Sequence, residues 1–111
     1  MAELIWSDDA ISDLEGIYDY IARNSPLYAR HQAERISTSI ERLLQHPDSG
    51  RHLPEFQNLP HREVIVDNYR VIYRHAPESD EIMVVAVVHG RRLLTKDFIK
   101  RSNASPLIYR D

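Results

Sequence analysis

The chain has 111 residues, of which 42% are hydrophobic and 28% charged, with no cysteine and a formal net charge of −3. This length suits one domain with a single core, and the absence of cysteine excludes disulfides, thiolate metal centres and cysteine nucleophiles. An acidic start and the lack of any run approaching about 20 apolar residues predict neither a signal peptide nor a membrane span, so we expect a cytoplasmic protein.

The first half of the chain predicts a strand and two helices. The apolar residues 3–6 end at Ser7, whose hydroxyl can cap the start of a helix. Apolar residues then recur at steps of three and four to about Arg23, and again from Pro26 to Leu44, which predicts two amphipathic helices. Because only a few residues join them, the two helices must lie antiparallel as a hairpin.

The second half changes to the pattern of strands. Residues 48–60 contain glycine and proline without a sustained period, which predicts a loop. Residues 62–66 and 69–74 flank the turn pair Asp67-Asn68 and predict a β-hairpin. Residues 82–88 are apolar at every position, which predicts a central strand covered on both faces.

The end of the chain carries fewer signals. Residues 93–99 fit either a short helix or an extended arm, and residues 107–109 are apolar enough to dock on the core. We expect one domain over residues 1–111, with residues 95–111 as a flexible tail.

The predicted order is β-α-α-β-β-β, an α+β fold in which a helix hairpin packs on a small, mainly antiparallel sheet. The first strand has no sequential partner, so we expect it to join the sheet beside the later strands.

Charge is distributed unevenly along the chain. Residues 1–50 hold four Lys and Arg against nine Asp and Glu, whereas residues 51–111 hold ten against eight. The segment from 91 to 101 holds five cations and one acid, Asp97; the cations are Arg91, Arg92, Lys96, Lys100 and Arg101. Such a basic end suits contact with nucleic acid or an acidic protein surface, and a solvated charged tail has the same composition.

Five segments of the chain carry a resemblance to a known family. They are DLEGIYDYIA (13–22), RLLQHPDSGR (42–51), REV (62–64), NYRVIYR (68–74) and VVHGRR (87–92). In order and spacing they resemble landmarks of ParE-type toxins of the RelE/ParE family, over about residues 3–95. The resemblance implies the RelE/ParE fold, in agreement with the predicted element order, and the role of toxin in a type II toxin-antitoxin system.

The resemblance implies two alternative activities. In RelE-like ribosome-dependent mRNA endonucleases, basic side chains stabilise phosphoryl transfer, and Arg70 and Arg92 stand where such enzymes place arginines. However, His61 and Glu63 replace closely spaced lysines, and Phe98 stands in place of an aromatic hydroxyl and has no proton to exchange. The departures favour a ParE-like inhibitor of DNA gyrase that breaks no bond itself, with a non-toxic family member as a third alternative.

Two contact surfaces follow from this hypothesis. The residues predicted to contact gyrase, or DNA through gyrase, are Arg70, His89, Arg91, Arg92 and Lys96. The residues predicted to contact a cognate antitoxin are Ile17, Ile21, Leu27 and Tyr28. We expect this antitoxin to have a DNA-binding N-terminal domain and a tail that folds on the toxin, so that the two form a hetero-oligomer away from any membrane.

Several of these residues also suit purely structural roles. Arg70 and Arg74 are compatible with salt bridges to Glu63 and Asp67, and His89 with a turn before Gly90. Tyr69 and Tyr73 suit packing as neighbours on one face of a strand. The six histidines show no metal-ligand spacing, so we expect neither a metal site nor a cofactor.

Overall fold

The computed structural model describes residues 2–103, and for residues 100–103 the course of the backbone only. Within this range five strands and three helices follow one another. They are β1 (Glu3–Trp6), α1 (Asp8–Ala22), α2 (Pro26–Arg42), β2 (Arg51–His52), β3 (Arg62–Val66), β4 (Tyr69–Ala76), β5 (Glu81–His89) and α3 (Lys96–Asn103). The predicted apolar stretch 107–109 lies outside the described residues.

The strands form one mixed sheet in the order β1-β5-β4-β3-β2. β1 runs parallel to β5, and the other neighbours are antiparallel. The predicted fold class is therefore confirmed, as is the expectation that the first strand joins the later ones. The predicted loop 48–60 needs one correction, because Arg51 and His52 form strand β2 beside β3. A two-residue strand is too short to leave an alternating pattern in the sequence.

β5 is the central strand of the core and is buried from Ile82 to Val88. Between Ile72 and Tyr73 of β4 the pairing skips one residue of β5, Val85, which is a β-bulge. The bulge explains why Val84 and Val87 both pack with the helix hairpin, although they are three positions apart. The opposite face of β5 packs against α3 and against residues of the loop after β2.

The two long helices begin at the predicted capping serines. The Ser7 hydroxyl accepts a hydrogen bond from the Ala10 amide at 3.0 Å and donates one to the Val85 carbonyl at 3.2 Å. The Ser25 hydroxyl accepts from the Tyr28 amide at 3.1 Å. Each cap satisfies a backbone donor that a helix start leaves free, and Ser7 also ties α1 to β5.

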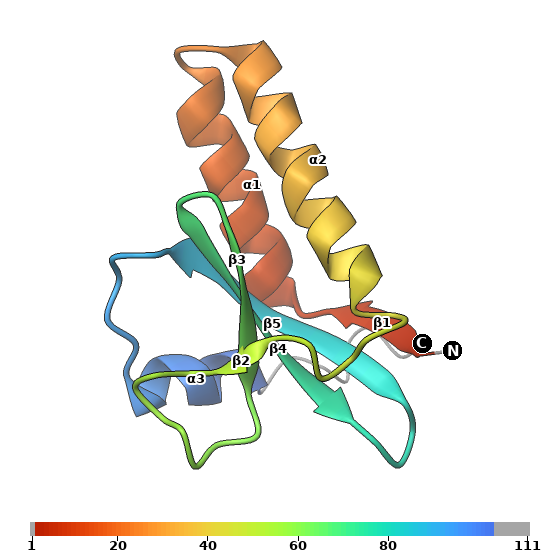
Figure 1. Ribbon diagram of the computed structural model, residues 1–111. Helices are drawn as coiled ribbons and strands as arrows, with labels where there is room; N and C mark the ends of the chain where they lie inside the picture. The colour runs from red at the N-terminus through yellow and green to blue at the C-terminus, as the bar shows by residue number, and fades with distance from the viewer. Residues whose placement is uncertain (1, 104–111) are drawn as a thin grey trace.

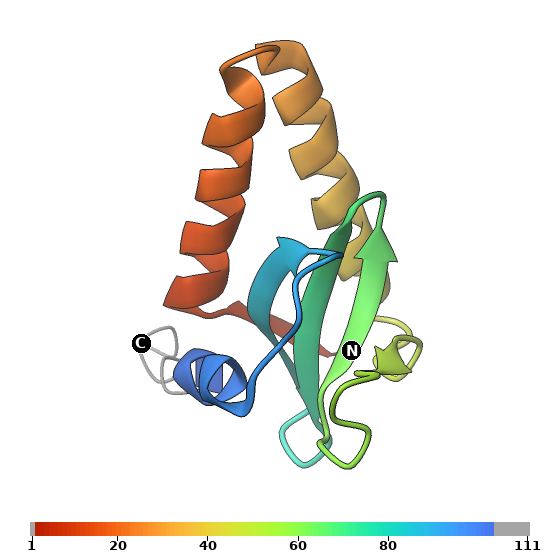
Figure 2. The same cartoon turned by 90° about the vertical axis from the view of Figure 1, so that its left-hand side faces the viewer.

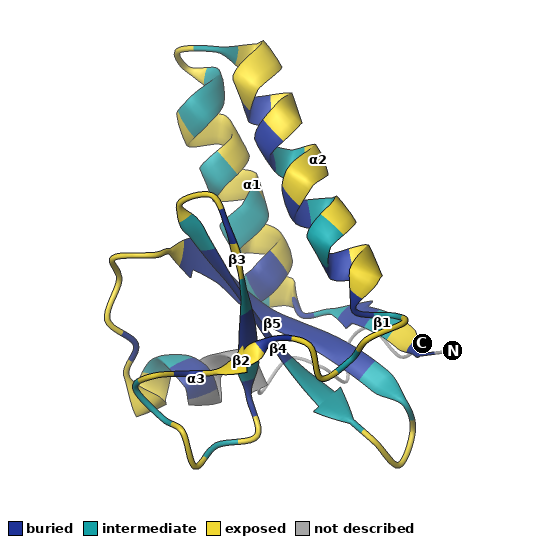
Figure 3. Ribbon diagram, in the orientation of Figure 1, coloured by how far each residue is buried: buried dark blue, intermediate teal, exposed yellow. Residues whose placement is uncertain are grey.

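The hairpin of α1 and α2 is longer than the sheet that it covers. Figures 1 and 2 show its far end standing clear of the strands, and Figure 3 shows burial concentrated on the lower and inner parts of both helices. Exposed apolar side chains therefore gather near the far end; they are Tyr20, Leu27 and Tyr28. None of the helices between residues 2 and 103 is long and apolar enough to span a membrane.

Candidate partner-binding surface

The basic segment begins with a tight turn at the end of β5. The Gly90 amide donates to the Asn68 carbonyl at 2.7 Å, and the Arg92 amide donates to the His89 carbonyl at 3.0 Å. The His89 ring also takes part, because its Nδ1 accepts from the Arg91 amide at 3.1 Å. A Cβ at Gly90 would lie 3.2 Å from the Asn68 carbonyl oxygen, so the close passage of the two turns favours glycine.

The turn presents most of the predicted contact residues to solvent. His89, Arg91, Arg92 and Lys96 are all exposed. The Arg92 guanidinium lies over the Phe98 ring, 4.3 Å from its centroid, which is a cation–π contact. Phe98 therefore orients a cation at the position where the resemblance implies an aromatic hydroxyl in ribonucleases.

Arg70, for which the sequence left open a contact with gyrase and a salt bridge to Glu63, lies beneath this surface. Its side chain is 6% exposed and lies between two carboxylates. The guanidinium donates to Glu55 through two hydrogen bonds of 2.8 Å and to Glu63 at 2.6 Å. A third partner is the Arg92 carbonyl, at 3.1 Å. Arg70 thus joins β4 to the loop after β2 and to the turn after β5, with its charge paired to both carboxylates.

The salt bridge between Arg70 and Glu63 was one of the structural alternatives in the sequence analysis, and the structure contains it. Glu63 is fully buried, and its second oxygen accepts from Arg51 Nε at 2.6 Å. Asp67 takes a different partner from the one considered: its carboxylate pairs with Arg35 of α2 at 2.7 Å. This pair attaches the β3–β4 turn to the hairpin.

The pair between Arg70 and Glu55 keeps both of its charges near neutral pH. Hydrogen bonding from Arg70 lowers the pKa of Glu55 from 4.5 to about 2, against the opposing effect of burial, and the Leu94 amide adds to the lowering. The hydrogen bond to Glu55 likewise raises the pKa of Arg70 above its ordinary value. Groups held in this way stabilise charge and position but exchange no proton near neutral pH.

A cavity of about 530 Å³ lies between the turn and β3. Its lining comes from three parts of the chain; the residues are Arg51, Pro54, Glu55, Ile65, Arg70, Gly90, Arg91, Arg92 and Leu93. Leu93 is 82% exposed and Ile65 is 51% exposed. Neither residue stood out in the sequence, because one leucine of the pair 93–94 and an apolar residue within a strand both look like core positions.

The two tyrosines of β4 pack in different clusters of the core, whereas the sequence suggested that they pack as neighbours. The Tyr69 ring meets the His89 ring edge to face, with centroids 5.8 Å apart. Tyr73 is fully buried, and its hydroxyl donates to the Pro47 carbonyl at 2.7 Å and accepts from the Gly50 amide at 2.9 Å. Burial raises the pKa of both hydroxyls.

The four residues predicted to contact an antitoxin divide into two pairs. Leu27 and Tyr28 are 56% and 55% exposed near the far end of the hairpin. Ile17 and Ile21 on α1 are half-buried, and Ile17 packs against the core. Tyr20, which the sequence analysis did not single out, is 69% exposed on the same helix.

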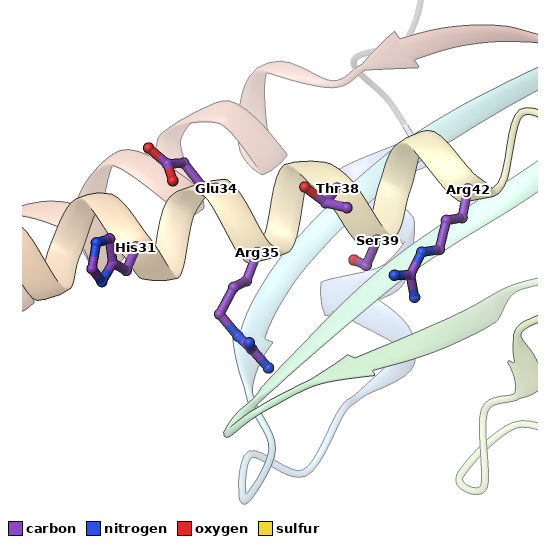
Figure 4. A pocket seen from close by; sticks show the side chains of 6 residues that line it. All are labelled: His31, Glu34, Arg35, Thr38, Ser39 and Arg42. Carbon is purple, nitrogen blue, oxygen red and sulfur yellow. The ribbon is translucent and has the colours of Figure 1, made fainter.

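A second hollow follows the outer side of α2. One part, of about 500 Å³, is lined by His31, Glu34, Arg35, Thr38, Ser39 and Arg42. In Figure 4, Arg35 and Arg42 extend from the helix toward the strands. An adjoining part of about 360 Å³ reaches Val64 and Ile65 of β3. Because β2 pairs with β3 only at Arg62 and Glu63, the remainder of β3 is an open sheet edge within the described part of the chain.

No group of three or more His, Cys, Asp or Glu side chains among the described residues is arranged to hold a metal ion. The surfaces above carry exposed cations, apolar side chains and an open strand edge, and this combination suits binding of a macromolecule.

Comparison with known proteins gives a consistent result. The family described as ParE toxin of the type II toxin-antitoxin system, parDE, matches residues 4–94. A relative named toxin RelE2, from Caulobacter vibrioides, is 33% identical over 93 residues, which span 84% of this chain and all of the relative.

Solved structures of toxin-antitoxin proteins share the fold. A chain from the chromosomal ParDE system of P. aeruginosa is 24% identical with a TM-score of 0.65, covering 80% of this chain and 96% of that one. A chain of the RelBE2 toxin-antitoxin complex from Mycobacterium tuberculosis is 18% identical with a TM-score of 0.56, covering 79% and 96%. A mutant of the E. coli toxin RelE in the free state is 12% identical with a TM-score of 0.59, covering 97% of both chains.

Proposed function

The chain belongs to the ParE toxin family, the toxins of type II toxin-antitoxin systems, and from this premise we propose that it inhibits DNA gyrase by binding. On this proposal the protein holds the cleaved-DNA intermediate of gyrase and so converts a normal step into double-strand breaks. The observation that carries the proposal is the state of Arg70, whose charge is neutralised from both sides by Glu55 and Glu63.

A ribonuclease would need free cations and a group that exchanges a proton at the reacting phosphate. The guanidinium of Arg70 is paired with Glu55 and Glu63, and these two carboxylates would repel an incoming RNA phosphate. Phe98 carries no hydroxyl and stacks with Arg92 instead. These contacts favour recognition of a partner over cleavage of a phosphodiester bond.

We assign the contact with gyrase to the exposed residues around the turn after β5. They are His89, Arg91, Arg92 and Lys96. Arg70 lies below this surface and positions the turn through its hydrogen bond to the Arg92 carbonyl. Exposed cations of this kind speed up association with an acidic surface and weaken it as salt rises.

The second partner is a cognate antitoxin, the kind of protein present in the solved complex from M. tuberculosis. We propose that its N-terminal domain binds DNA and that its tail covers the hairpin near Leu27 and Tyr28 and the hollow along α2 (Figure 4). The exposed side chains of Leu27 and Tyr28 would be buried by such a tail. Both partners act in the cytoplasm.

A ribosome-dependent mRNA endonuclease is the alternative function. It is supported by the name of the relative RelE2 and by the exposed guanidinium of Arg92, at a position where the resemblance implies a catalytic arginine. On this alternative the protein would cleave mRNA bound to the ribosome and would have no effect on purified gyrase.

One set of assays separates the two functions. The purified protein is added to gyrase with relaxed plasmid, and separately to ribosomes carrying an mRNA. We expect loss of supercoiling with accumulation of broken DNA, and intact mRNA. Intact supercoiling together with cleaved mRNA would overturn the proposal, and no effect in either assay would point to a family member without toxicity.

Charge reversal locates the contact surface. The double substitution Arg91→Glu and Arg92→Glu should abolish growth arrest and gyrase inhibition. The matched control reverses two exposed arginines on the hairpin, Arg23→Glu and Arg30→Glu, and should retain both activities. Undiminished growth arrest by the first variant would count against the assigned surface.

A further inference from the structure

Leu93 is unusually exposed for a leucine. With 82% of its surface accessible, it is the most exposed large hydrophobic residue in the described part of the chain. It follows directly on the arginine pair 91–92, and the next residue, Leu94, is buried in the core. A single exposed leucine is common on protein surfaces and does not by itself indicate a binding site. The evidence for a binding site at Leu93 comes from its backbone hydrogen bonds and from the residues around it.

The backbone on both sides of Leu93 is held in place. The Arg92 carbonyl accepts from Arg70 Nη1 at 3.1 Å, and the Leu94 amide donates to Glu55 Oε2 at 3.2 Å. Arg70 and Glu55 are themselves joined by two hydrogen bonds of 2.8 Å. The outward position of Leu93 therefore follows from a fixed backbone, and a partner would bind it without the cost of ordering a loop.

Apolar and basic side chains surround Leu93 in a definite pattern. Ile65, 51% exposed, and Pro54 share with it the cavity of about 530 Å³. Three exposed arginines border the same cavity; they are Arg51, Arg91 and Arg92. An apolar centre within a charged border is the usual arrangement of a protein-protein contact, in which the central residues carry most of the binding energy.

We propose that Leu93 and Ile65 form the centre of a protein-binding surface, and that its partner is an acidic segment of gyrase bearing an apolar side chain that enters this cavity. The inference rests on the proposed function and specifies it: the contact at this surface is with gyrase protein and not with DNA. Arg51, Arg91 and Arg92 supply the complement to the acidic residues of the segment.

The apolar side chains at the centre of this surface favour protein over nucleic acid. Leu93 is 82% exposed and Ile65 is 51% exposed. A phosphate backbone brings one negative charge with every nucleotide, and its contacts are made by cations and hydrogen-bond donors. Neither an exposed leucine nor an exposed isoleucine adds to such contacts, whereas both add to a contact with a protein side chain.

The test compares two exposed leucines on different surfaces. Leu93→Ser removes the proposed centre, and Leu27→Ser removes an exposed leucine from the hairpin. Both variants should keep the urea midpoint of the wild type, since exposed substitutions of this kind change stability little. Binding of each protein is then measured to the two purified gyrase subunits separately without DNA, to duplex DNA alone and to the purified antitoxin.

We expect the wild type to bind one gyrase subunit without DNA, and Leu93→Ser to bind it at least about 10-fold more weakly with unchanged binding of the antitoxin. Leu27→Ser should show the reverse, unchanged binding of gyrase and weaker binding of the antitoxin, because Leu27 lies on the surface proposed for the antitoxin. The remaining affinity of Leu93→Ser should still fall with salt, because its arginines are unchanged.

Four results would overturn the inference. Equal gyrase affinity of Leu93→Ser and the wild type would do so and leave the proposed function intact. A loss confined to duplex DNA would assign the surface to nucleic acid, and a loss confined to the antitoxin would assign it to that partner. A wild-type protein that neither binds nor inhibits gyrase would remove the proposed function itself, and the inference with it.

Discussion

The Arg70–Glu55 pair predicts a specific dependence of stability on pH. The fall of the Glu55 pKa from 4.5 to about 2 corresponds to about 3 kcal/mol, at about 1.4 kcal/mol per pH unit. Because the Glu55 side chain is 19% exposed, solvent screens part of this interaction, and we expect it to contribute about 2 kcal/mol. A lowered pKa means that the stabilisation is complete above the unfolded-state value near 4.5 and is lost as the pH falls toward about 2.

The substitution Glu55→Gln tests this magnitude. It removes the charge but keeps the size, so the variant should lose about 2 kcal/mol of unfolding free energy at neutral pH. Urea unfolding at about pH 7, 5, 4 and 3 should show the difference from wild type shrinking as the pH falls, since the wild type loses the same interaction in acid.

Glu78→Gln is the matched control, because Glu78 is exposed in the turn between β4 and β5. It should unfold at the wild-type midpoint at neutral pH. If the curves of wild type and Glu55→Gln instead fall in parallel from about pH 5 to 3, the pair does not stabilise the fold in the way argued from its geometry.

Four further substitutions test the packing by urea unfolding. Gly50→Ala should destabilise by about 1–3 kcal/mol, because its Cβ would lie 2.6 Å from the Tyr73 hydroxyl; an unchanged midpoint would contradict this. Gly16→Ala should stabilise by up to about 1 kcal/mol, since the site is an open helix position; a lower midpoint would refute it. Tyr73→Phe should cost about 1–3 kcal/mol by leaving the Gly50 amide without its partner. Ser7→Ala should cost about 1–2 kcal/mol through loss of the helix cap.

The fold followed from local signals, which the sequence contains. The helix starts at Ser7 and Ser25, the turn at Asp67-Asn68 and the apolar run of β5 each depend on residues a few positions apart, and the structure confirms them. Strand β2 was missed because its two residues are held by pairing with β3, a contact between distant positions. Helix α3 resolves the alternative left open for residues 93–99 in favour of a helix.

The site was predictable only in part, for the same reason. The exposure of Arg91, Arg92 and Lys96 follows from a charged segment after a buried strand. The burial of Arg70 does not, because it depends on Glu55, which lies in a loop without periodicity and reaches Arg70 only in the folded chain. Leu93 was missed because exposure of one apolar residue leaves no pattern in a sequence.

Glu55 and Glu63 bear both on the ribonuclease alternative and on the proposed binding surface around Leu93. Glu63 counted against a ribonuclease in the sequence because of its charge alone, and in the structure Glu63 and Glu55 together enclose the arginine that such an enzyme would use. The same Arg70–Glu55 pair then fixes the backbone on both sides of Leu93. Replacing both glutamates by neutral residues would therefore leave the Arg70 charge unpaired, but it would not supply the proton-exchanging group that cleavage requires. The same replacement would loosen the backbone on both sides of Leu93, at the centre of the proposed binding surface.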